Sequence, residues 1–368
     1  MLCAGTREPQ KERRGTSKYG NAGRKGNKLL ADWNLPEEVK NRLSEIGSFG
    51  LARGTWSSYR TAERQLLRCQ KERKTDMSLP LTQEKTLIFI DWLINDRKVK
   101  AATVKSYLSG LRQMHIEKGI DQPEIRKAMV NMIIRGKQNM DNIEARRGQL
   151  PGRLPVTLTI MKLLKSCIGS WTASLDEKLL VWAVSTVAFH GSFRIHEILC
   201  KKETEFDPDF TLLGRDVSLT TCKGNTEDRE RLSFNIKCPK EAKTGRSIVV
   251  DLFETKGETC PVRAFKKWRN RTETKPNEPL FMNKGNRPMT GRKLNSIIKQ
   301  LLGKHVDYRK GKITSHSFRA GMALLLAEKG FEEEEIKITG RWNSRAFEHY
   351  TKLPRTRREE ISRRLGNI

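Results

Sequence analysis

The chain has 368 residues, which is enough for two domains, and its 72 lysines and arginines outnumber its 43 aspartates and glutamates. The resulting net charge of +29 and pI near 10.0 predict a polyanionic partner, with nucleic acid first and a ribosome or an anionic membrane surface as rivals. No run is apolar enough for a membrane span and no signal peptide is visible, so we expect an intracellular protein.

The cysteines are scattered and form no C-x-x-C pair, which argues against a disulfide framework and a zinc site. We interpret them as reduced thiols, mostly structural. They are Cys3, Cys69, Cys167, Cys200, Cys222, Cys238 and Cys260.

The N-terminal segment, residues 1–28, holds eight lysines and arginines against two acids and has no apolar periodicity. This composition predicts a disordered basic arm. The arm either contacts DNA or nuclear import receptors, or is a solvated tail without a specific partner.

Residues 29–145 have helical apolar spacing and predict an all-α domain, a compact bundle of four short helices. We expect a first helix capped by Thr55, a second opened by Leu79–Thr82, a third over Ala102–His115 and a fourth over Glu124–Arg135.

Two basic side chains, Lys105 and Arg112, fall on the outward face of the third predicted helix. They are candidate DNA contacts, although a charged outer face is often only solvated, and charge alone gives no register on a duplex. Residues 146–155 are rich in Arg, Gly and Pro and predict a linker between the two domains. Arg146 and Arg147 in this linker are further candidate DNA contacts.

The second domain, residues 156–368, begins with predicted helices over 157–167 and 179–189. The latter is strongly apolar and is interrupted at His190-Gly191-Ser192, directly before Arg194. Glu197 follows three residues later, a spacing that by itself usually means an ion pair on a helix surface.

Three β-like runs follow, at 212–220, 232–238 and 247–253, and residues 239–246 predict the turn of a hairpin. That turn region carries Lys237, Lys240 and Lys243, and a lysine on an exposed turn is normally inert. Helices over 260–268 and 290–302 and a strand over 279–281 complete a predicted α+β domain, mainly helical with a small antiparallel sheet.

The stretch 312–350 has an order that is chemical. His316 and Arg319 stand three apart at the start of a helical pattern, so their side chains share one face. A second helix with acids in its first turn ends at Gly340, and Trp342 follows. A short third helix then carries Phe347 inward and ends at Tyr350.

These residues, in this order, resemble the signature of the tyrosine recombinase (phage-integrase-type) superfamily: H-x-x-R, then G-[HW], then a nucleophilic tyrosine. The form HSFRAG, GRW and a tyrosine eight residues after Trp342 is most similar to integrases of eukaryotic DIRS-like and Crypton-like mobile elements. Phage and plasmid relatives usually space the last pair one residue wider, and many have histidine in place of Trp342. The resemblance covers about residues 50–350.

The resemblance implies a role for each matching residue. Tyr350 would attack the scissile phosphate and form a 3′-phosphotyrosine. Arg194 and Arg319 would clamp the non-bridging oxygens, a geometry that suits guanidinium. His316 would act as donor or as base for the tyrosine. Trp342 would donate its indole N–H, which cannot shuttle a proton.

The family also places a catalytic lysine at the tip of the hairpin, where Lys240 aligns best and Lys237 and Lys243 compete. No Walker loop, acidic metal cluster or H-E-x-x-H motif occurs, and we expect no cofactor and no metal. Fixed cations and a protein nucleophile suffice for metal-independent transesterification.

The implied partner is double-stranded DNA, bound by a homotetramer on paired sites and by a monomer or dimer when free, with no membrane and no small-molecule substrate. The N-terminal domain would be the family's core-binding domain, and the basic tail 354–364 would dock on a neighbouring subunit. DNA recombination and integration in the nucleus are the expected process and place, or the cytoplasm in a prokaryotic host.

Three other classes stay open. A type IB topoisomerase uses a similar constellation but relaxes supercoils without paired sites. A domesticated element protein would bind DNA without cutting it. An RNA-binding or ribosome-associated protein would explain the charge but leave the ordered motif to chance.

Overall fold

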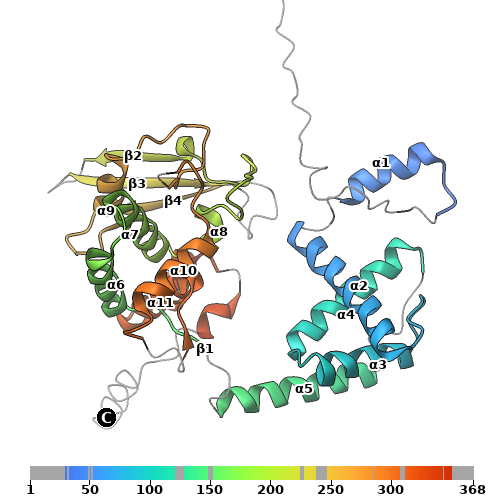
Figure 1. Ribbon diagram of the computed structural model, residues 1–368. Coiled ribbons are helices and arrows are strands. Elements are labelled where there is room, and N and C mark those ends of the chain that lie inside the picture. The colour runs from blue at the N-terminus through green and yellow to red at the C-terminus, as the bar shows by residue number, and fades with distance from the viewer. Residues whose placement is uncertain are drawn as a thin grey trace, which may run out of the picture. The chain divides into compact units, whose positions relative to one another are not determined.

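The computed structural model describes residues 30, 33–48, 50, 53–120, 128–147, 152–223, 228–237, 247–283, 285–306, 311–342 and 344–349. The chain divides into two compact units, Met1–Arg147 and Gly148–Ile368 (Figure 1). Each unit has its own hydrophobic core. The division lies inside the segment 146–155 that the sequence analysis assigns to a linker. In the described part of the chain no helix is long and apolar enough to cross a bilayer.

All the regular elements in the described part of the first unit are helices. Its helices are α1 (Glu37–Ser48), α2 (Arg53–Arg73), α3 (Gln83–Asp91), the π-helical turn η1 (Trp92–Asp96), α4 (Ala101–Glu117) and α5 (Ala128–Arg146). Thr82 caps α3 as expected, since its side chain accepts a hydrogen bond from the Lys85 N–H at 3.3 Å. Thr55 is not a cap, because α2 already begins at Arg53. The fourth predicted helix, Glu124–Arg135, was placed too early in the chain at its C-terminal end, since α5 continues to Arg146.

Helices α2 and α4 cross at close range (Figure 1). The crossing point is Gly110, where an added Cβ would lie 2.7 Å from Cβ of Ala62 and 3.0 Å from Cα of Tyr59. Only a residue without a side chain allows the two backbones to approach so closely. The core beneath the crossing contains the fully buried rings of Phe89 and Trp92.

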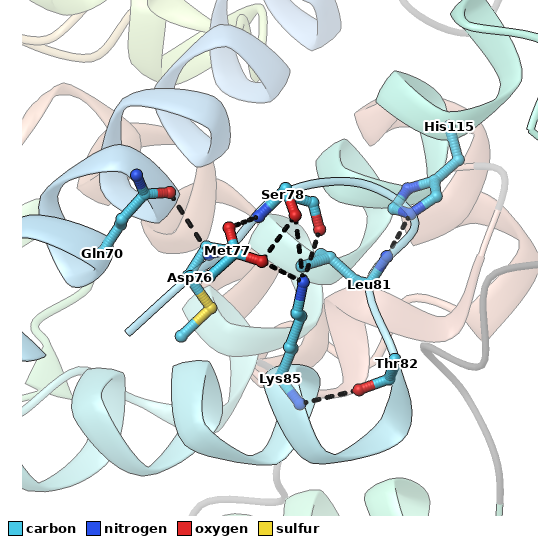
Figure 2. A network of polar contacts seen from close by, with 8 residues as sticks. All are labelled: Gln70, Asp76, Met77, Ser78, Leu81, Thr82, Lys85 and His115. Carbon is cyan, nitrogen blue, oxygen red and sulfur yellow. Dashed lines mark hydrogen bonds and ion pairs between the residues drawn. The ribbon is translucent and has the colours of Figure 1, made fainter. Parts of the chain in front are cut away.

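A polar network fixes the connection from α2 to α3 (Figure 2). The ammonium of Lys85 contacts the Asp76 carboxylate at 2.7 Å and the Ser78 carbonyl at 3.1 Å. The Leu81 N–H donates to Nε2 of buried His115 at 3.0 Å. Burial lowers the pKa of His115, which favours the neutral ring that this acceptor role requires.

The second unit is mainly helical with two small sheets. Its helices are α6 (Leu158–Ser170), α7 (Leu175–His190), α8 (Ile195–Ile198), the 3₁₀ turn η3 (Gly214–Asp216), α9 (Pro261–Arg269), α10 (Gly291–Leu302), α11 (Ser315–Glu328), α12 (Glu333–Gly340) and the 3₁₀ turn η4 (Arg345–His349). Its strands are β1 (Gly152–Arg153), β2 (Val217–Cys222), β3 (Arg229–Ile236), β4 (Ile248–Phe253) and β5 (Gly311–Lys312).

The larger sheet is antiparallel with β3 in the middle, paired with β2 and β4. Helix α9 lies against β3 and β4, and α7 packs on α9 (Figure 1). Because α7 is covered on every side, its middle is apolar or small all round rather than striped. The predicted all-α first domain and mainly helical second domain with a small antiparallel sheet are therefore confirmed.

The strand predictions were right in number for this sheet but shifted at their ends. Strand β2 begins at Val217 rather than at 212, because η3 turns the chain first. Residues 279–281 form no regular strand, and Pro279 makes one isolated bridge with Leu213.

The parallel pair β1–β5 was not foreseen, because two residues are too short for any periodicity. It matches Gly152 with Gly311 and Arg153 with Lys312. Part of the predicted linker is therefore bound to the second unit.

Helix α11 is fixed against the chain just before α6. The Val156 N–H donates to the Ser317 carbonyl at 2.9 Å, and a Cβ added at Gly321 would lie 1.9 Å from the Val156 carbonyl oxygen. The buried face of α11 also packs on α7. These contacts position the first turns of α11, which carry His316 and Arg319.

Candidate active site

The turn that follows α7 places Arg194. The chain reverses through Gly191 and Ser192, where Ser192 has a left-handed φ of 46°. A Cβ at Gly191 would lie 2.1 Å from Cε2 of Phe193, so the buried phenyl ring fills the space that a side chain would need. Arg194 is then the first residue outside α8 and acts as its N-cap.

Glu197 holds Arg194 in place. The Arg194 N–H donates to Oε2 of Glu197 at 2.9 Å, and Nη1 of Arg194 donates to Oε1 at 3.0 Å. The Glu197 side chain is only 8% exposed, so this pair is not the solvated surface pair that its spacing alone suggests. A shielded carboxylate that binds both the backbone and the guanidinium fixes the direction of the arginine.

Helix α11 brings Arg319 to the same turn. Its start is fixed by the Thr314 N–H, which donates to Oγ of Ser317 at 3.0 Å. One turn further, Arg319 is buried, with 3% exposed, and its Nη1 donates to the Ser192 carbonyl at 2.6 Å. Two arginines that are 125 residues apart in the sequence, Arg194 and Arg319, are thus anchored at one loop.

His316 lies half-buried in the first turn of α11, in positive surroundings. Burial lowers its pKa first, and the charges of Arg153, His196, Arg319 and Arg194 lower it further. The lowered pKa keeps the imidazole neutral, so that one ring nitrogen can accept a hydrogen bond, and the neighbouring cations would attract a phosphate. Arg153 comes from β1, so the short sheet adds a cation that sequence analysis had placed in the linker.

Arg341 is a site residue that sequence analysis did not single out. Its Nη1 donates to the Gly191 carbonyl at 3.0 Å and its Nη2 pairs with Oε2 of Glu197 at 3.0 Å. Its guanidinium carbon lies 5.0 Å from the ring centroid of Phe193. The sequence signal for Arg341 was its position directly after Gly340, where a helix is predicted to end. Nothing in the sequence reveals that its side chain contacts Gly191 and Glu197.

Trp342 stacks on Arg319. The guanidinium carbon of Arg319 lies 4.1 Å from the centroid of the indole. A Cβ at Gly340 would lie 1.9 Å from Nε1 of Trp342, so the glycine makes room for the indole. Phe347 points inward as expected, with 1% exposed, and packs with α11 and α12 in a small separate cluster.

The structure describes only one of the four remaining candidates, which are the three hairpin lysines and the tyrosine nucleophile. Tyr350, Lys240 and Lys243 lie outside the described residues. Lys237 lies within them, and its Nζ pairs with Oδ2 of Asp216 at 2.6 Å and donates to the Pro208 carbonyl at 2.9 Å. Lys237 is therefore held by a buried carboxylate, and which of the three lysines is the general acid stays a prediction.

The candidate DNA contacts belong to the first unit. Lys105, Arg112 and Arg147 are exposed, and the side chain of Arg146 lies outside the description. Lys105 donates to Oε1 of Gln138 at 2.7 Å and lines a groove of about 310 Å³ between α4 and α5. These positions leave the side chains accessible, and their contact with DNA stays a prediction.

The site of the second unit therefore combines Arg194, Arg319, Arg341, His316 and Trp342. Within the described ranges no cluster of His, Cys, Asp and Glu side chains could hold a metal ion. Guanidinium groups fixed by backbone carbonyls and a shared carboxylate can bind a phosphodiester and stabilise the charge that develops on it.

Residues 224–356 match the profile of the Phage integrase family. The match includes His316, Arg319, Trp342 and the position of Tyr350, and it begins after Arg194. No curated protein sequence is significantly similar to the chain.

Solved structures share the fold at low sequence identity. The XerH site-specific recombinase bound to difH substrate before cleavage has a TM-score of 0.55 at 15% identity, over 93% of this chain and 89% of that chain. The Tn1549 transposon integrase with circular intermediate DNA has a TM-score of 0.50 at 13% identity, over 90% and 95%. A lambda integrase dimer bound to a core site has a TM-score of 0.51 at 12% identity, over 87% and 82%.

Proposed function

We propose that this chain is a member of the tyrosine recombinase and phage integrase superfamily and acts as a DNA strand-transferase, which the family match over residues 224–356 and the shared fold support. It cuts and rejoins DNA strands site-specifically through a covalent 3′-phosphotyrosine, without a metal. The activity fits the net charge of +29, which favours a polyanionic substrate.

The observation that carries this proposal is the contact between Arg319 and the Ser192 carbonyl at 2.6 Å, next to Arg194. It brings together the two arginines that the sequence signature requires. Two fixed guanidinium groups around one spot match the two non-bridging oxygens of a phosphodiester. A chance H-x-x-R motif would not explain why the turn that carries Arg194, from another part of the fold, contacts Arg319.

The chemistry follows from these positions. Tyr350 attacks phosphorus, its proton passes to neutral His316, and the 5′-oxygen leaves as a hydroxyl after it takes a proton from a hairpin lysine, Lys240 in our alignment. Arg194 and Arg319 stabilise the added negative charge on the phosphorus oxygens. The reverse reaction with a 5′-hydroxyl of a partner strand completes the exchange.

The finer assignments are part of the same proposal. The GRW motif with a tyrosine eight residues after Trp342 supports a mobile-element integrase of the DIRS-like or Crypton-like type. For such an element the site of action is the nucleus, with entry through the basic arm 1–28. Strand exchange requires paired sites and so a homotetramer, and one related structure is a dimer on a core site.

Covalent capture tests the proposal. The protein is incubated with fragmented DNA of its own flanking locus, the mixture is denatured, and DNA that stays attached to protein is sequenced. We expect recurrent cut positions, attached through the 3′ end and released by protease. If no DNA becomes covalently attached to the protein, the proposed strand-transferase activity is rejected. If the protein relaxes a supercoiled plasmid but shows no recurrent cut positions, a topoisomerase is supported instead.

A further inference from the structure

We propose that Arg341 is a positioning residue that links the segment bearing Trp342 to the turn bearing Arg194. The inference rests on the proposed function and adds a residue to it. Arg341 holds no substrate in this account. It acts through the carbonyls of the turn and through the carboxylate of Glu197.

Arg341 is connected to both arginines of the clamp. Its Nη2 contacts Oε2 of Glu197 at 3.0 Å, and Oε1 of the same carboxylate binds Nη1 of Arg194 at 3.0 Å. Its own carbonyl accepts a hydrogen bond from Nη2 of Arg319 at 3.4 Å. One residue therefore contacts Arg319 through its backbone and reaches Arg194 through one shared carboxylate.

The turn between α7 and α8 is the common anchor. The Ser192 carbonyl accepts from Nη1 of Arg319 at 2.6 Å and from Nη2 of Arg341 at 3.3 Å. The Gly191 carbonyl accepts from Nη1 of Arg341 at 3.0 Å. With Phe193 against the flat face of Arg341, the turn is held from several directions.

The backbone conformation of Arg341 supports a functional role for its side chain. It ends α12 with a left-handed φ of 52°, a conformation that is unfavourable for residues with a side chain and easy for glycine. The arginine side chain is 11% exposed and Glu197 is 8% exposed. A strained and shielded arginine at a position that suits glycine points to a function for its side chain.

The consequence is a coupling between two parts of the fold. The end of α12 and Trp342 are fixed by the same side chain that fixes the Arg194 turn, although the two are separated by about 150 residues. A displaced turn would misdirect Arg194 while leaving most contacts with DNA intact. The defect would therefore appear in the bond-breaking step rather than in binding, because a small misplacement of a clamp costs rate.

The test uses the full chain and the cut position recovered from the wild-type protein. Arg341→Gly removes the guanidinium and suits the left-handed backbone, and Glu197 keeps its two hydrogen bonds from Arg194, so we expect the variant to fold. Arg341→Lys keeps the charge and loses the forked geometry. Arg345→Ala is the matched control, because Arg345 is 80% exposed and pairs only at the surface with Glu348 among the described residues. Covalent attachment is followed in single turnover at saturating protein, beside DNA affinity and thermal unfolding.

We expect Arg341→Gly to slow attachment about 10- to 100-fold, as loss of a residue that orients a catalytic group does, with DNA affinity and unfolding midpoint near those of the wild type. Arg341→Lys should recover part of the rate, and Arg345→Ala should match the wild type. Equal rates for Arg341→Gly and the wild type would overturn the inference. So would a loss that disappears when the temperature is lowered further below the unfolding midpoint.

A double-mutant cycle tests the route through Glu197. If both residues act on Arg194, Glu197→Gln combined with Arg341→Gly should lose about as much as the worse single variant. Losses that multiply would show independent actions and contradict the proposed route. A wild-type protein that forms no adduct would reject the proposed function itself, which separates that failure from failure of this inference.

Discussion

The guanidinium carbon of Arg319 lies 4.1 Å from the centre of the Trp342 ring, while Nη1 of the same arginine donates to the Ser192 carbonyl. The indole thus supports one face of the arginine, and the turn fixes its edge. A cation over an indole is stabilised by about 0.5–2 kcal/mol, more when water is excluded. Trp342 therefore positions Arg319, in addition to the N–H donor role that the family resemblance implies.

The first prediction separates these two actions of Trp342. Trp342→Phe keeps an aromatic face for Arg319 and loses the indole N–H, whereas Trp342→Ala loses both. If the stacking matters more, Trp342→Phe should cleave DNA close to the wild-type rate and Trp342→Ala should be slower by roughly tenfold, the equivalent of about 1.4 kcal/mol. Single-turnover adduct formation measures both. Equal loss in the two variants would assign the main role to the N–H.

The second prediction concerns the placement of α11. Gly321→Ala would put a methyl group 1.9 Å from the Val156 carbonyl oxygen, and backbone cannot move aside cheaply. We expect it to lower the free energy of unfolding by about 1–3 kcal/mol or more. Gly169→Ala is the control, because nothing lies within 4 Å of its added Cβ, and it should be neutral or stabilising by up to about 1 kcal/mol. Urea unfolding of both variants decides, and equal midpoints would contradict the close contact.

The third prediction is a pH dependence of stability from His190. Burial lowers its pKa from 6.5 to about 4, and its Nε2 lies 3.2 Å from Oγ1 of Thr259. The unfolded chain therefore binds the proton more readily, so this contribution is complete above pH 6.5 and is lost as pH falls toward 4, up to about 3 kcal/mol. His190→Gln should unfold with a flatter profile between these pH values. If the free energy of unfolding of His190→Gln depends on pH as steeply as that of the wild type, the burial of His190 does not contribute to the pH dependence of stability.

The fourth prediction identifies the general acid. An alkoxide leaving group, with a parent pKa of about 15.7, needs a proton donor worth roughly 10²- to 10⁴-fold, but a thiolate with a parent pKa of about 8.5 does not. Lys240→Ala should therefore cleave ordinary DNA slowly and a strand with sulfur at the bridging 5′ position almost normally. If sulfur rescues Lys243→Ala instead, our alignment of the hairpin is wrong by three residues.

Lys237→Ala is the internal control in that series. It removes the partner of Asp216, whose side chain is 7% exposed, and an uncompensated buried carboxylate costs about 3–5 kcal/mol. The variant should lose stability and show the same relative loss on both substrates. A selective rescue by sulfur would contradict its structural role.

The sequence predicted the parts of the fold that depend on local signals. Thr82, Thr157 and Thr290 cap helices at the positions where the sequence predicts those helices to begin, because a side-chain oxygen ahead of an apolar repeat is a local signal. Thr55 failed as a cap because nothing local shows that α2 already begins at Arg53. The β1–β5 pair was missed for a related reason, since residues 152–153 and 311–312 are far apart in the chain and too few to show periodicity.

The site residues also divide into those that local sequence signals reveal and those that only tertiary contacts reveal. His316, Arg319 and Trp342 were found because they stand close together in one ordered stretch. Arg341 is adjacent to Trp342, but its role depends on Gly191, Ser192 and Glu197, about 150 residues earlier, and only the structure brings these together. Arg153 near His316 was hidden in the same way, because its strand looked like a linker.

The most direct test of the account is the identity of the residue that becomes attached to DNA. The captured adduct is digested with nuclease and protease, and the modified peptide is sequenced by mass spectrometry beside the Tyr350→Phe variant. We predict a nucleotide on Tyr350 in the wild type, and no adduct with unchanged DNA binding in the variant, because only the nucleophilic oxygen is lost. An adduct that persists in Tyr350→Phe, on Tyr308 or elsewhere, would contradict the account.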